Sequence, residues 1–296
     1  VLNKVAVVTG ANAGIGFQTT LSLVRMGARV VMACRSMDKA TQAQGELLAA
    51  VPGADTVIIP LDLSEPESVR EFARRFAAEI GRLDLLVNNA GIVGIPLARN
   101  SVGQELQLAT NYLGGFALTG LLLPLFPASG WARIVNVGSL MNRFGKLDLD
   151  DLNWEKTPYD EWQGYGRSKV AMLSFTLELD RRLRKSGSNI VALSAHPGFA
   201  STNIHQNSAA LQPKSAFDAW RKKKLEPLIP RADQAARPIA HAATADTVQG
   251  GEYYGPKGLF EIAGKKVGKA RINPVARDTA LGKRLWTLSE SMTGVR

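Results

Sequence analysis

Short continuous hydrophobic runs alternate along the chain with longer stretches in which hydrophobic residues recur at helical spacing. The first run, 5–8 (VAVV), has the length and the branched side chains of a strand buried on both faces. Similar runs follow at 29–34, 56–61, 85–88, 133–137 and 189–195. The helical pattern occupies about 15–26, 37–50, 64–81, 104–123 and 159–185. This order predicts a mainly parallel sheet with helices on both faces, joined by right-handed crossovers.

Two segments depart from this alternation. Residues 199–231 are rich in small and polar residues and then strongly basic, and so long an insertion is typical of a functional lid or a mobile loop. Near the end of the chain, 276–290 has leucines at helical spacing, which predicts a packed helix that covers an edge of the sheet. No change in composition divides the chain, so we expect residues 1–296 to form one doubly wound α/β domain.

The composition limits the kinds of partner. Hydrophobic residues make up 45% of the 296 positions, which is enough for one large core. The net charge is +10, and most of the basic surplus follows residue 185. Nucleic-acid binding usually adds interleaved aromatic residues or a known module, whereas the one tight basic run here is 221–224. We interpret it as a solvated helix face, with attraction of an anionic cofactor as the alternative, and expect no nucleic-acid partner.

No charged residue lies between Glu105 and Arg133, so a membrane span has to be weighed. Gln107, Asn111 and two prolines in this stretch would be expensive to bury in lipid, and we therefore expect a buried helix and no integral membrane span. The single cysteine, Cys34, excludes an internal disulfide and a multi-cysteine metal site. The printed chain opens without a charged-then-apolar leader, and we expect a cytoplasmic location.

A glycine-rich turn, Thr9–Gly16, joins the first strand to the first helix. Glycine allows the positive φ angles and the close backbone approach that a pyrophosphate requires, and a helix start offers unpaired N–H groups. A glycine turn alone is weak evidence, but its place after the first strand of an alternating chain indicates dinucleotide binding. The expected contacts are Gly10, Asn12, Ala13, Gly14, Ile15 and Gly16.

The end of the second strand decides between NAD and NADP. An acidic residue there binds the ribose 2′-hydroxyl, whereas an arginine accommodates a 2′-phosphate. Here Cys34 is followed by Arg35 and Ser36, and the first carboxylate is that of Asp38. Because a guanidinium can bind a phosphate through two hydrogen bonds, we expect Arg35 to select NADPH.

The spacing Tyr-x-x-x-Lys occurs twice. Tyr253 and Lys257 flank a Gly-Pro pair that disfavours a continuous helix, whereas Tyr165 and Lys169 lie early in a long helix, where they share one face. Reduction of a carbonyl by hydride requires a proton, which Tyr165 can donate. An adjacent Lys169 ammonium should lower the phenol pKa from its ordinary value of about 10, and Lys169 can also reach the nicotinamide ribose. Ser139, at the end of the fifth strand, is placed to hold the carbonyl oxygen.

These motifs resemble those of the short-chain dehydrogenase/reductase family, whose fold is a Rossmann domain. The resemblance rests on the G-x-x-x-G-x-G spacing of the first turn, on Asn-Asn-Ala-Gly at 88–91 and on the Tyr165 pair, and it covers nearly the whole chain. The insert at 147–162, His-Pro-Gly at 196–198 and the Leu-Trp-x-x-Ser-Glu tail resemble the branch that contains retinol dehydrogenases and protochlorophyllide-reductase-like oxidoreductases.

The resemblance implies further site residues. Asn111 matches the residue that anchors a proton-relay water, which completes a catalytic set of Asn111, Ser139, Tyr165 and Lys169. Cofactor contacts are implied at Tyr165, Lys169, Asp62, Leu63, Asn89, Ala90, Gly91, Pro197, Gly198 and Thr202.

Two nearby features qualify this set. His196 is expected to have a positional role, and no metal is expected, because no second histidine or carboxylate cluster accompanies it. The family often has Ser-Ser where this chain has Gly138-Ser139, and only the second serine is required.

The sequence therefore predicts an NADPH-dependent oxidoreductase that reversibly reduces a ketone or aldehyde to an alcohol. The alternative is a non-catalytic dinucleotide sensor or interaction protein on the same fold, a class that typically lacks the tyrosine or the lysine. Family members are often dimers or tetramers, but this branch also has monomers, so the oligomeric state stays open. We expect a small hydrophobic carbonyl or alcohol substrate, because the loop after the fourth strand and the predicted lid are apolar: Ile92, Val93, Ile95, Leu97, Ile204, Leu211, Phe217, Trp220 and Leu225.

Overall fold

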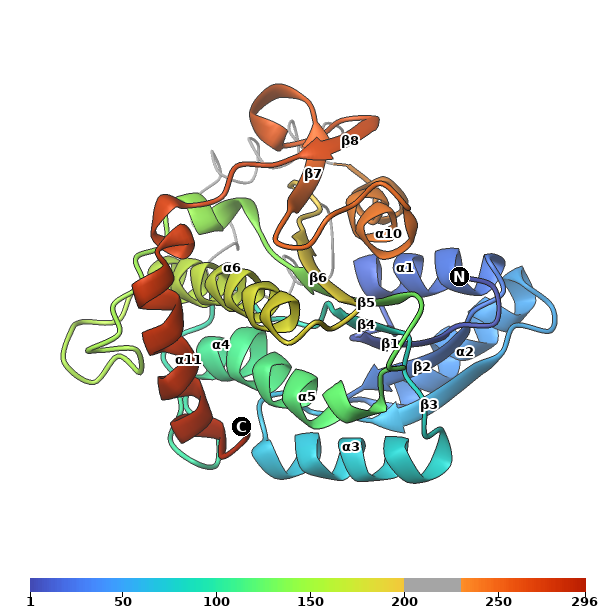
Figure 1. The fold of residues 1–296 in the computed structure, drawn as a ribbon, viewed down its shortest axis with the longest axis horizontal. Helices are drawn as coiled ribbons and strands as arrows, with labels where there is room; N and C mark the ends of the chain where they lie inside the picture. Colours follow the sequence, from blue (N-terminus) through green and yellow to red (C-terminus); the bar gives the residue numbers. More distant parts are fainter. Residues whose placement is uncertain (200–229) are drawn as a thin grey trace, which may run out of the picture.

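The strands form a single sheet in the computed structural model, which describes residues 1–199 and 230–296 (Figure 1). The strand order is β3-β2-β1-β4-β5-β6-β7-β8, and every neighbouring pair is parallel except β7 and β8. The doubly wound α/β fold with a mainly parallel sheet is confirmed. The strands are β1 (Val5–Thr9), β2 (Arg29–Cys34), β3 (Thr56–Pro60), β4 (Leu85–Asn88), β5 (Ala132–Val137), β6 (Ile190–Ala195), β7 (Tyr253–Lys257) and β8 (Lys266–Lys269).

Helices cover both faces of the sheet (Figure 1). One layer contains α1 (Gly14–Arg25), α2 (Met37–Ala50), α9 (Ala232–Ala235) and α10 (Arg237–Thr244). The other layer contains α3 (Pro66–Glu79), α4 (Leu106–Leu108), α5 (Gly114–Leu122) and α6 (Glu161–Lys185). Each layer has its own buried hydrophobic cluster against the sheet, as a sheet that is buried on both faces requires.

The helix predicted at 104–123 is interrupted in its first half. Between α4 and α5 the residues Ala109–Leu113 form a π turn, and the run ends in the 3-10 turn Leu123–Leu125. In the described part of the chain, this run is the one helix long and apolar enough to cross a membrane by length and composition, but 67% of its most apolar window is buried inside the protein. Core helices share these properties, so this is weak evidence for a span.

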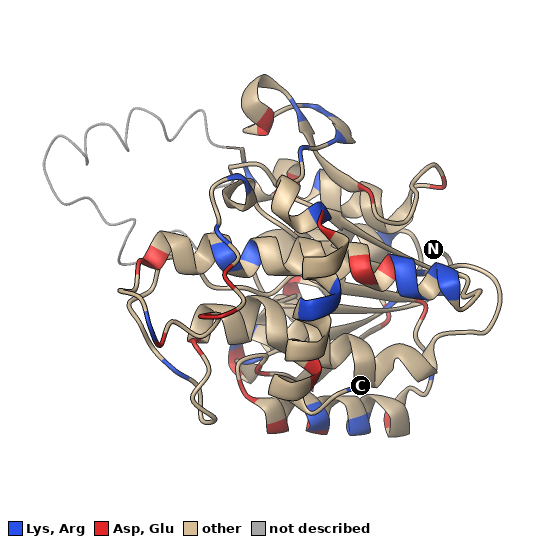
Figure 2. Cartoon of the chain, turned by 60° about the vertical axis from the view of Figure 1, so that its left-hand side comes forward, with Lys and Arg blue, Asp and Glu red and all other residues tan. Residues whose placement is uncertain are grey.

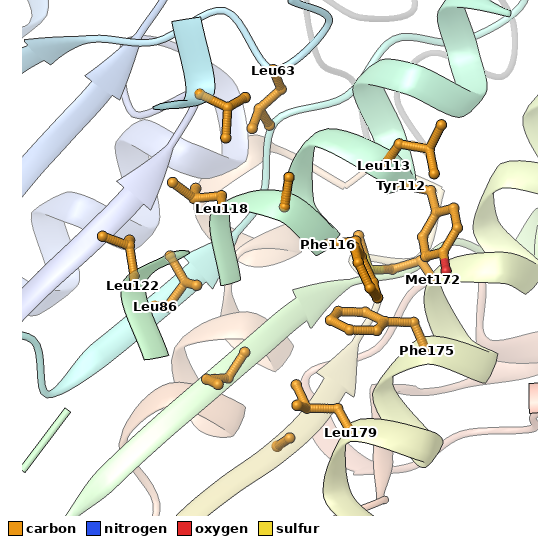
Figure 3. Close-up of a cluster of buried hydrophobic side chains, with 14 of the residues drawn as sticks. Leu63, Leu86, Tyr112, Leu113, Phe116, Leu118, Leu122, Met172, Phe175 and Leu179 are labelled. Carbon is orange, nitrogen blue, oxygen red and sulfur yellow. The ribbon is translucent and has the colours of Figure 1, made fainter. Parts of the chain in front are cut away.

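The C-terminal helix α11 (Thr279–Thr293) packs on α6 and α5. The sequence pattern predicted instead a helix that covers an edge of the sheet. Its Trp286 ring lies 5.1 Å from that of Phe116 and 5.7 Å from that of Phe175, centroid to centroid. The hydroxyls of Tyr112 and Ser289 share a hydrogen bond of 2.6 Å inside this aromatic cluster (Figure 3 shows Tyr112, Phe116 and Phe175). Helix α11 therefore covers the outer side of α5 and α6 and buries the aromatic cluster between them.

The segment after residue 230 contains elements that the sequence pattern did not predict, namely α9, α10, β7 and β8. Tyr253–Lys257 is a strand, which agrees with the expectation that it is not a continuous helix. Smaller differences concern helix starts: Glu65 and not Ser64 is the N-cap of α3, and Asp160 caps α6. The predicted lid at 199–231 lies almost wholly outside the described residues, and the single-domain interpretation of 1–296 stays a prediction.

Acidic and basic residues are neighbours along α3 and α6 and form ion pairs there; Figure 2 colours the charged positions on the ribbon. On α6, Arg182 lies 2.9 Å from Glu178, and on α3, Arg75 lies 2.9 Å from Glu79. The pair on α3 is exposed to solvent, whereas the Glu178 carboxylate on α6 is buried. The basic run at 221–224 lies outside the described residues.

A buried carboxylate fixes the start of β4 against β1. Asp84 accepts a hydrogen bond of 2.9 Å from the backbone N–H of Val5, and it pairs with the Arg82 guanidinium and with Lys4. Burial alone would raise the pKa of Asp84, but the hydrogen bonds from Arg82 and Val5 and the Lys4 charge outweigh it and hold the pKa below its usual value. The carboxylate is thus a charged clamp between neighbouring strands.

We expect Asp84→Asn to lower the free energy of unfolding at pH 7 by about 1–3 kcal/mol, because two basic side chains lose their charged partner. A lowered pKa in the folded state stabilises the protein above the ordinary carboxyl pKa, and this stability is lost as the pH falls through the folded-state value. Urea unfolding from pH 7 to pH 2.5 should therefore show the two proteins converging below about pH 4. The control Asp55→Asn, in an exposed ion pair with Arg29, should change stability by less than about 0.5 kcal/mol; an equal effect would contradict the clamp.

Candidate active site

The residues singled out in the sequence meet at the carboxyl ends of the parallel strands. The sheet order reverses between β1 and β4, since β2 and β3 lie on one side of this pair and β5 and β6 on the other. Connections that leave to opposite sides open a crevice at such a point, and ligands of open α/β sheets bind there. Among the predicted site residues, Thr202 lies outside the described residues, as do the lid residues from Ile204 to Leu225.

The turn after β1 has the backbone geometry expected for a phosphate site. Gly10 and Gly14 have φ angles of 66° and 53°, which glycine adopts without strain. A Cβ on Gly16 would lie 2.2 Å from the Gly10 carbonyl oxygen, so only glycine fits at the start of α1. Ala13, the N-cap residue, offers no side-chain cap, and the first turn of α1 has no acidic residue. The first N–H groups of the helix are therefore left for an anion.

The end of β4 is tied directly to this turn. The Thr9 hydroxyl oxygen accepts hydrogen bonds of 2.9 Å from the backbone N–H groups of both Asn89 and Ala90. In return, the Asn89 side chain donates to the Thr9 carbonyl oxygen at 2.8 Å. A Cβ on Gly91 would come within 2.9 Å of the Asn111 side-chain oxygen and 3.6 Å of Lys169 Nζ. Residues 89–91 thus lie between the glycine turn after β1 and the predicted catalytic side chains of Asn111 and Lys169.

Arg35 and Asp62 face each other at the ends of β2 and β3. The Arg35 side chain is 75% exposed and lies 3.8 Å from the Asp62 carboxylate, a distance that leaves the guanidinium free to turn toward a ligand. Asp62 itself is oriented by Ser64, whose backbone N–H and hydroxyl donate to its carboxylate at 2.9 and 2.5 Å. Burial raises the pKa of Cys34 to about 11, opposed by hydrogen bonds from the turn at Ala11 and Asn12, so the thiol is neutral.

Tyr165 and Lys169 lie one turn apart on α6, as predicted. The Lys169 Nζ atom is 5.7 Å from the centroid of the Tyr165 ring and donates a hydrogen bond of 2.9 Å to the Val137 carbonyl oxygen at the end of β5. Burial lowers the pKa of Lys169 to about 8. In the described structure this carbonyl is the one hydrogen-bond acceptor of the three ammonium protons, so a ligand hydroxyl could be bound by the others.

The Ser139 hydroxyl acts on the Tyr165 phenol and lowers its pKa. Ser139 follows β5 and is the N-cap of the 3-10 turn Leu140–Arg143, where its hydroxyl accepts from the Met141 N–H at 3.2 Å. Burial raises the pKa of Tyr165 and outweighs the opposing effect of Ser139. The lowering of the phenol pKa by the Lys169 ammonium stays a prediction.

Asn111 connects the catalytic helix to the loop after β4. It lies in the π turn, where its side-chain oxygen accepts from the Ile92 N–H at 2.7 Å and its amide donates to the Ile92 carbonyl oxygen at 2.9 Å. The amide also donates to the Ser168 hydroxyl at 3.0 Å, beside Lys169 on α6. The structure therefore brings Asn111, Ser139, Tyr165 and Lys169 together, while the water-relay role of Asn111 stays a prediction.

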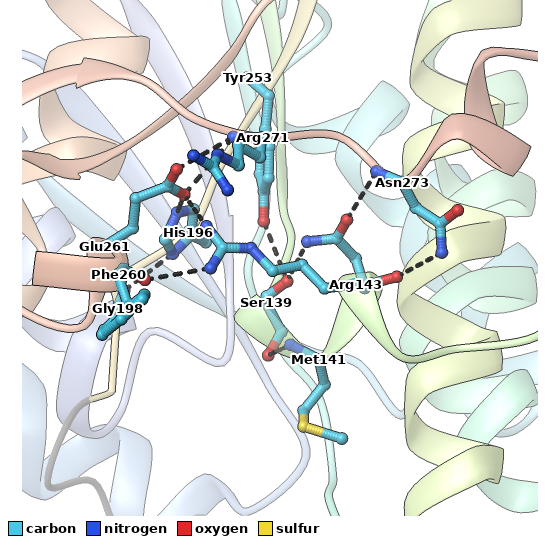
Figure 4. Close-up of polar contacts among 11 residues, drawn as sticks. Ser139, Met141, Arg143, His196, Gly198, Tyr253, Phe260, Glu261, Arg271 and Asn273 are labelled. Atoms are coloured by element: carbon cyan, nitrogen blue, oxygen red, sulfur yellow. Dashed lines mark hydrogen bonds and ion pairs between the residues drawn. The ribbon is translucent and has the colours of Figure 1, made fainter.

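The turn after β6 is held by His196. The Nδ1 atom of His196 accepts a hydrogen bond of 3.1 Å from the Gly198 N–H, and Nε2 lies 3.2 Å from the Glu261 carboxylate (Figure 4). Burial lowers the pKa of His196, so the ring is neutral. In the described chain no group of three or more His, Cys, Asp or Glu residues could hold a metal ion. The contacts of His196 are those of a positioning side chain for Pro197 and Gly198.

Tyr253 was not predicted to contact the site; in the sequence it stands out only as part of the second Tyr-x-x-x-Lys spacing. The Tyr253 hydroxyl donates to the Ser139 carbonyl oxygen at 3.1 Å (Figure 4). A Cβ on Gly138 would lie 2.6 Å from this hydroxyl oxygen, so glycine at 138 and tyrosine at 253 fit each other. The signal in the sequence was the glycine that replaces the first serine of the family's pair.

The comparisons with known proteins agree with this geometry. The family model for short chain dehydrogenases matches residues 4–212. Retinol dehydrogenase 13 of Mus musculus is 38% identical over 295 residues, which cover 99% of this chain and 84% of that protein. An uncharacterized protein from Mycobacterium paratuberculosis has a similar structure, with a TM-score of 0.81, 36% identity and coverage of 100% of this chain and 95% of that one. The RhlG/NADP complex of Pseudomonas aeruginosa has a TM-score of 0.66 and 26% identity over 86% of this chain and 94% of its own.

Proposed function

Because the chain belongs to the short-chain dehydrogenase family, whose members bind a nicotinamide dinucleotide, we propose that it is an NADPH-dependent oxidoreductase that reduces a ketone or aldehyde to an alcohol, reversibly. The observation that carries the proposal is the meeting of Ser139, Tyr165 and Lys169: the Lys169 ammonium lies 5.7 Å from the phenol ring and is bonded to the Val137 carbonyl oxygen, two residues before Ser139. This arrangement lies beside a glycine turn whose backbone fits a pyrophosphate.

The side chains divide the work of reduction between them. A bound nicotinamide nucleotide supplies the hydride to the carbonyl carbon. Ser139 holds the carbonyl oxygen while negative charge develops on it, and Tyr165 donates its phenolic proton to that oxygen, which completes the alcohol. In the reverse direction the Tyr165 phenolate takes the proton back. The raised pKa of Tyr165 keeps the phenol protonated, which favours its use as an acid.

Lys169 and Asn111 support this chemistry. A Lys169 pKa of about 8 leaves most of the side chain charged at neutral pH, so the ammonium stabilises the phenolate that forms after proton donation. Its other N–H groups would bind the ribose hydroxyls of the nucleotide. Asn111 fixes the loop at Ile92 and the Ser168 hydroxyl, and it thereby holds this side of the site to α6.

Arg35 supports NADPH as the preferred nucleotide. It is exposed at the end of β2, where a 2′-phosphate would lie, and no carboxylate precedes Asp38. Its partner Asp62 is 3.8 Å away, and Asp62 has its own hydrogen bonds from Ser64, so turning Arg35 toward a phosphate leaves that carboxylate satisfied. The RhlG structure, a relative in fold, contains NADP.

The loop after β4 supports the proposal of an apolar, uncharged substrate. Residues 91–98 carry no charged side chain, and Val93 is buried while Ile92 and Ile95 are partly exposed. The loop is held in place by bonds from the Gly94 N–H to Gln107 at 2.9 Å and from the Tyr159 hydroxyl to the Ile95 carbonyl oxygen at 3.4 Å. Relatives named retinol dehydrogenases agree with a preference for a bulky apolar alcohol or carbonyl compound.

We expect Tyr165→Phe to reduce kcat by roughly 10²–10⁴, the usual contribution of a general acid, while NADPH binding followed by fluorescence changes little. Tyr254→Phe is the matched control, because the Tyr254 hydroxyl bonds Glu252 and does not contact Ser139. Retention of more than about a tenth of the activity by the Tyr165 variant is incompatible with its role as the proton donor.

Arg35→Asp should raise KM for NADPH at least about tenfold and improve the use of NADH, because the carboxylate repels the 2′-phosphate and binds a 2′-hydroxyl. Arg29→Asp, at the opposite end of β2, should leave the preference unchanged. Steady-state kinetics with both nucleotides decide the question, and a wild-type preference for NADH would disprove the assignment.

The substrate preference can be tested with matched pairs. We expect kcat/KM for an aryl ketone to exceed that for a short 2-keto acid by about tenfold or more, because a carboxylate would be desolvated without a partner in this loop. The methyl ester of the same keto acid separates charge from size and should recover most of the difference. A keto acid that reacts faster than both neutral compounds would show that the site binds an anion.

A further inference from the structure

One carboxylate, that of Glu261, joins three segments beside the site (Figure 4). Glu261 lies in the loop between β7 and β8. Its carboxylate is 2.6 Å from the Arg143 guanidinium and 3.2 Å from His196 Nε2, and it also accepts from the Arg271 N–H at 3.3 Å. The Arg143 and Glu261 side chains are 22% and 18% exposed, so this is a largely buried contact. Water therefore screens these interactions only weakly.

Through His196, Glu261 acts on the turn after β6. Because Nδ1 accepts a hydrogen bond from the Gly198 N–H, the ring proton is on Nε2 and is donated to Glu261. The carboxylate thus fixes the tautomer that can hold Gly198 in its left-handed conformation, with φ of 78°. The Phe199 N–H donates to the Ile262 carbonyl oxygen at 2.9 Å, which adds a second bond between the loop and this turn.

Through Arg143, the same carboxylate acts on the segment that contains Ser139. Arg143 ends the 3-10 turn that Ser139 caps, and it also donates to the Phe260 carbonyl oxygen at 3.1 Å. The Ser139 carbonyl oxygen is held from the other side by Tyr253 at 3.1 Å and by the Asn142 amide at 2.6 Å. The position of the serine hydroxyl therefore depends on contacts with the β7–β8 region.

The backbone of the loop is strained in a way that serves these contacts. Phe260 and Glu261 have φ angles of 53° and 60°, a left-handed region that costs a residue with a side chain of order 1 kcal/mol or more. The Phe260 side chain is 70% exposed, so its burial does not offset the strain. The conformation does direct the Phe260 carbonyl and the Glu261 carboxylate toward Arg143.

We propose that Glu261 is a positioning residue for hydride transfer, which holds the Ser139 segment and the Pro197–Gly198 turn in a fixed relation to each other. This role rests on the proposed function, in which Ser139 holds the carbonyl oxygen and Pro197 and Gly198 are expected contacts of the nucleotide. A purely structural role would stabilise the β7–β8 loop without affecting either segment, and the experiment separates the two.

The test compares Glu261→Gln with Glu252→Gln, a control in which the carboxylate at the start of β7 loses its pairing with Lys269 and Tyr254 away from Ser139. We expect kcat of Glu261→Gln to fall by about 10- to 100-fold, since a displacement of about 1 Å at a reacting group can cost on the order of 10². KM should change less than kcat. The control should keep its kcat.

Hydrogen–deuterium exchange gives a readout without turnover. In Glu261→Gln the amides of 139–145 and 196–199 should exchange at least about tenfold faster, while those of α11 stay unchanged. In a double variant with Arg143→Gln, the loss in kcat should be smaller than the product of the two single losses, because each single variant already breaks the Arg143–Glu261 pair.

Each outcome decides the proposal. Normal kcat or normal exchange in both segments of Glu261→Gln overturns it, and so does an equal loss in the Glu252→Gln control. If the wild-type protein reduces no carbonyl compound, the proposed function fails. The exchange data then still decide the positioning claim, which stands if both segments exchange faster and falls if they do not.

Discussion

The reciprocal bonds between Thr9 and Asn89 determine where every other part of the site can lie. β1 and β4 are neighbours in the sheet but far apart in the chain, and their connections leave toward opposite sides. The Thr9 hydroxyl accepts two N–H groups of the β4 end, and the Asn89 amide returns a bond to the Thr9 carbonyl oxygen. The turn after β1 and residues 89–91 are therefore held together by three hydrogen bonds, and Lys169 of α6 lies next to Gly91.

The sequence predicted most of this unit because its signals are local. Hydrophobic runs identified β1 to β6, and glycine spacing identified the turn, since both depend on near neighbours in the chain. β7 could not be found in this way, because Tyr253–Lys257 contains glycine and proline and pairs with β6 through only Tyr253 and Tyr254. The π turn at Asn111 was missed for a related reason, as the apolar pattern of a helix continues through it unchanged.

The candidate site likewise contains residues that could be predicted from the sequence and contacts that could not. Tyr165, Lys169 and Ser139 could be chosen from their chemistry and their places at element ends, and the structure brings them together. The rise of the Tyr165 pKa could not be predicted, because it depends on burial of the ring by segments that are distant in the sequence. The contacts of Glu261 were also invisible, since they require a left-handed backbone in the β7–β8 loop and three partners that are remote in sequence.

The π turn at 109–113 has a consequence for how such a site arises during evolution. A π turn contains one residue more than the α turn it replaces, so at the level of the gene it corresponds to a single inserted codon. Because the wider turn takes up the additional residue locally, Asn111 bonds the loop at Ile92 while Tyr112 and Phe116 pack in the core. A single additional residue is thus sufficient to add a polar group to the site while the apolar face of the helix stays in the core.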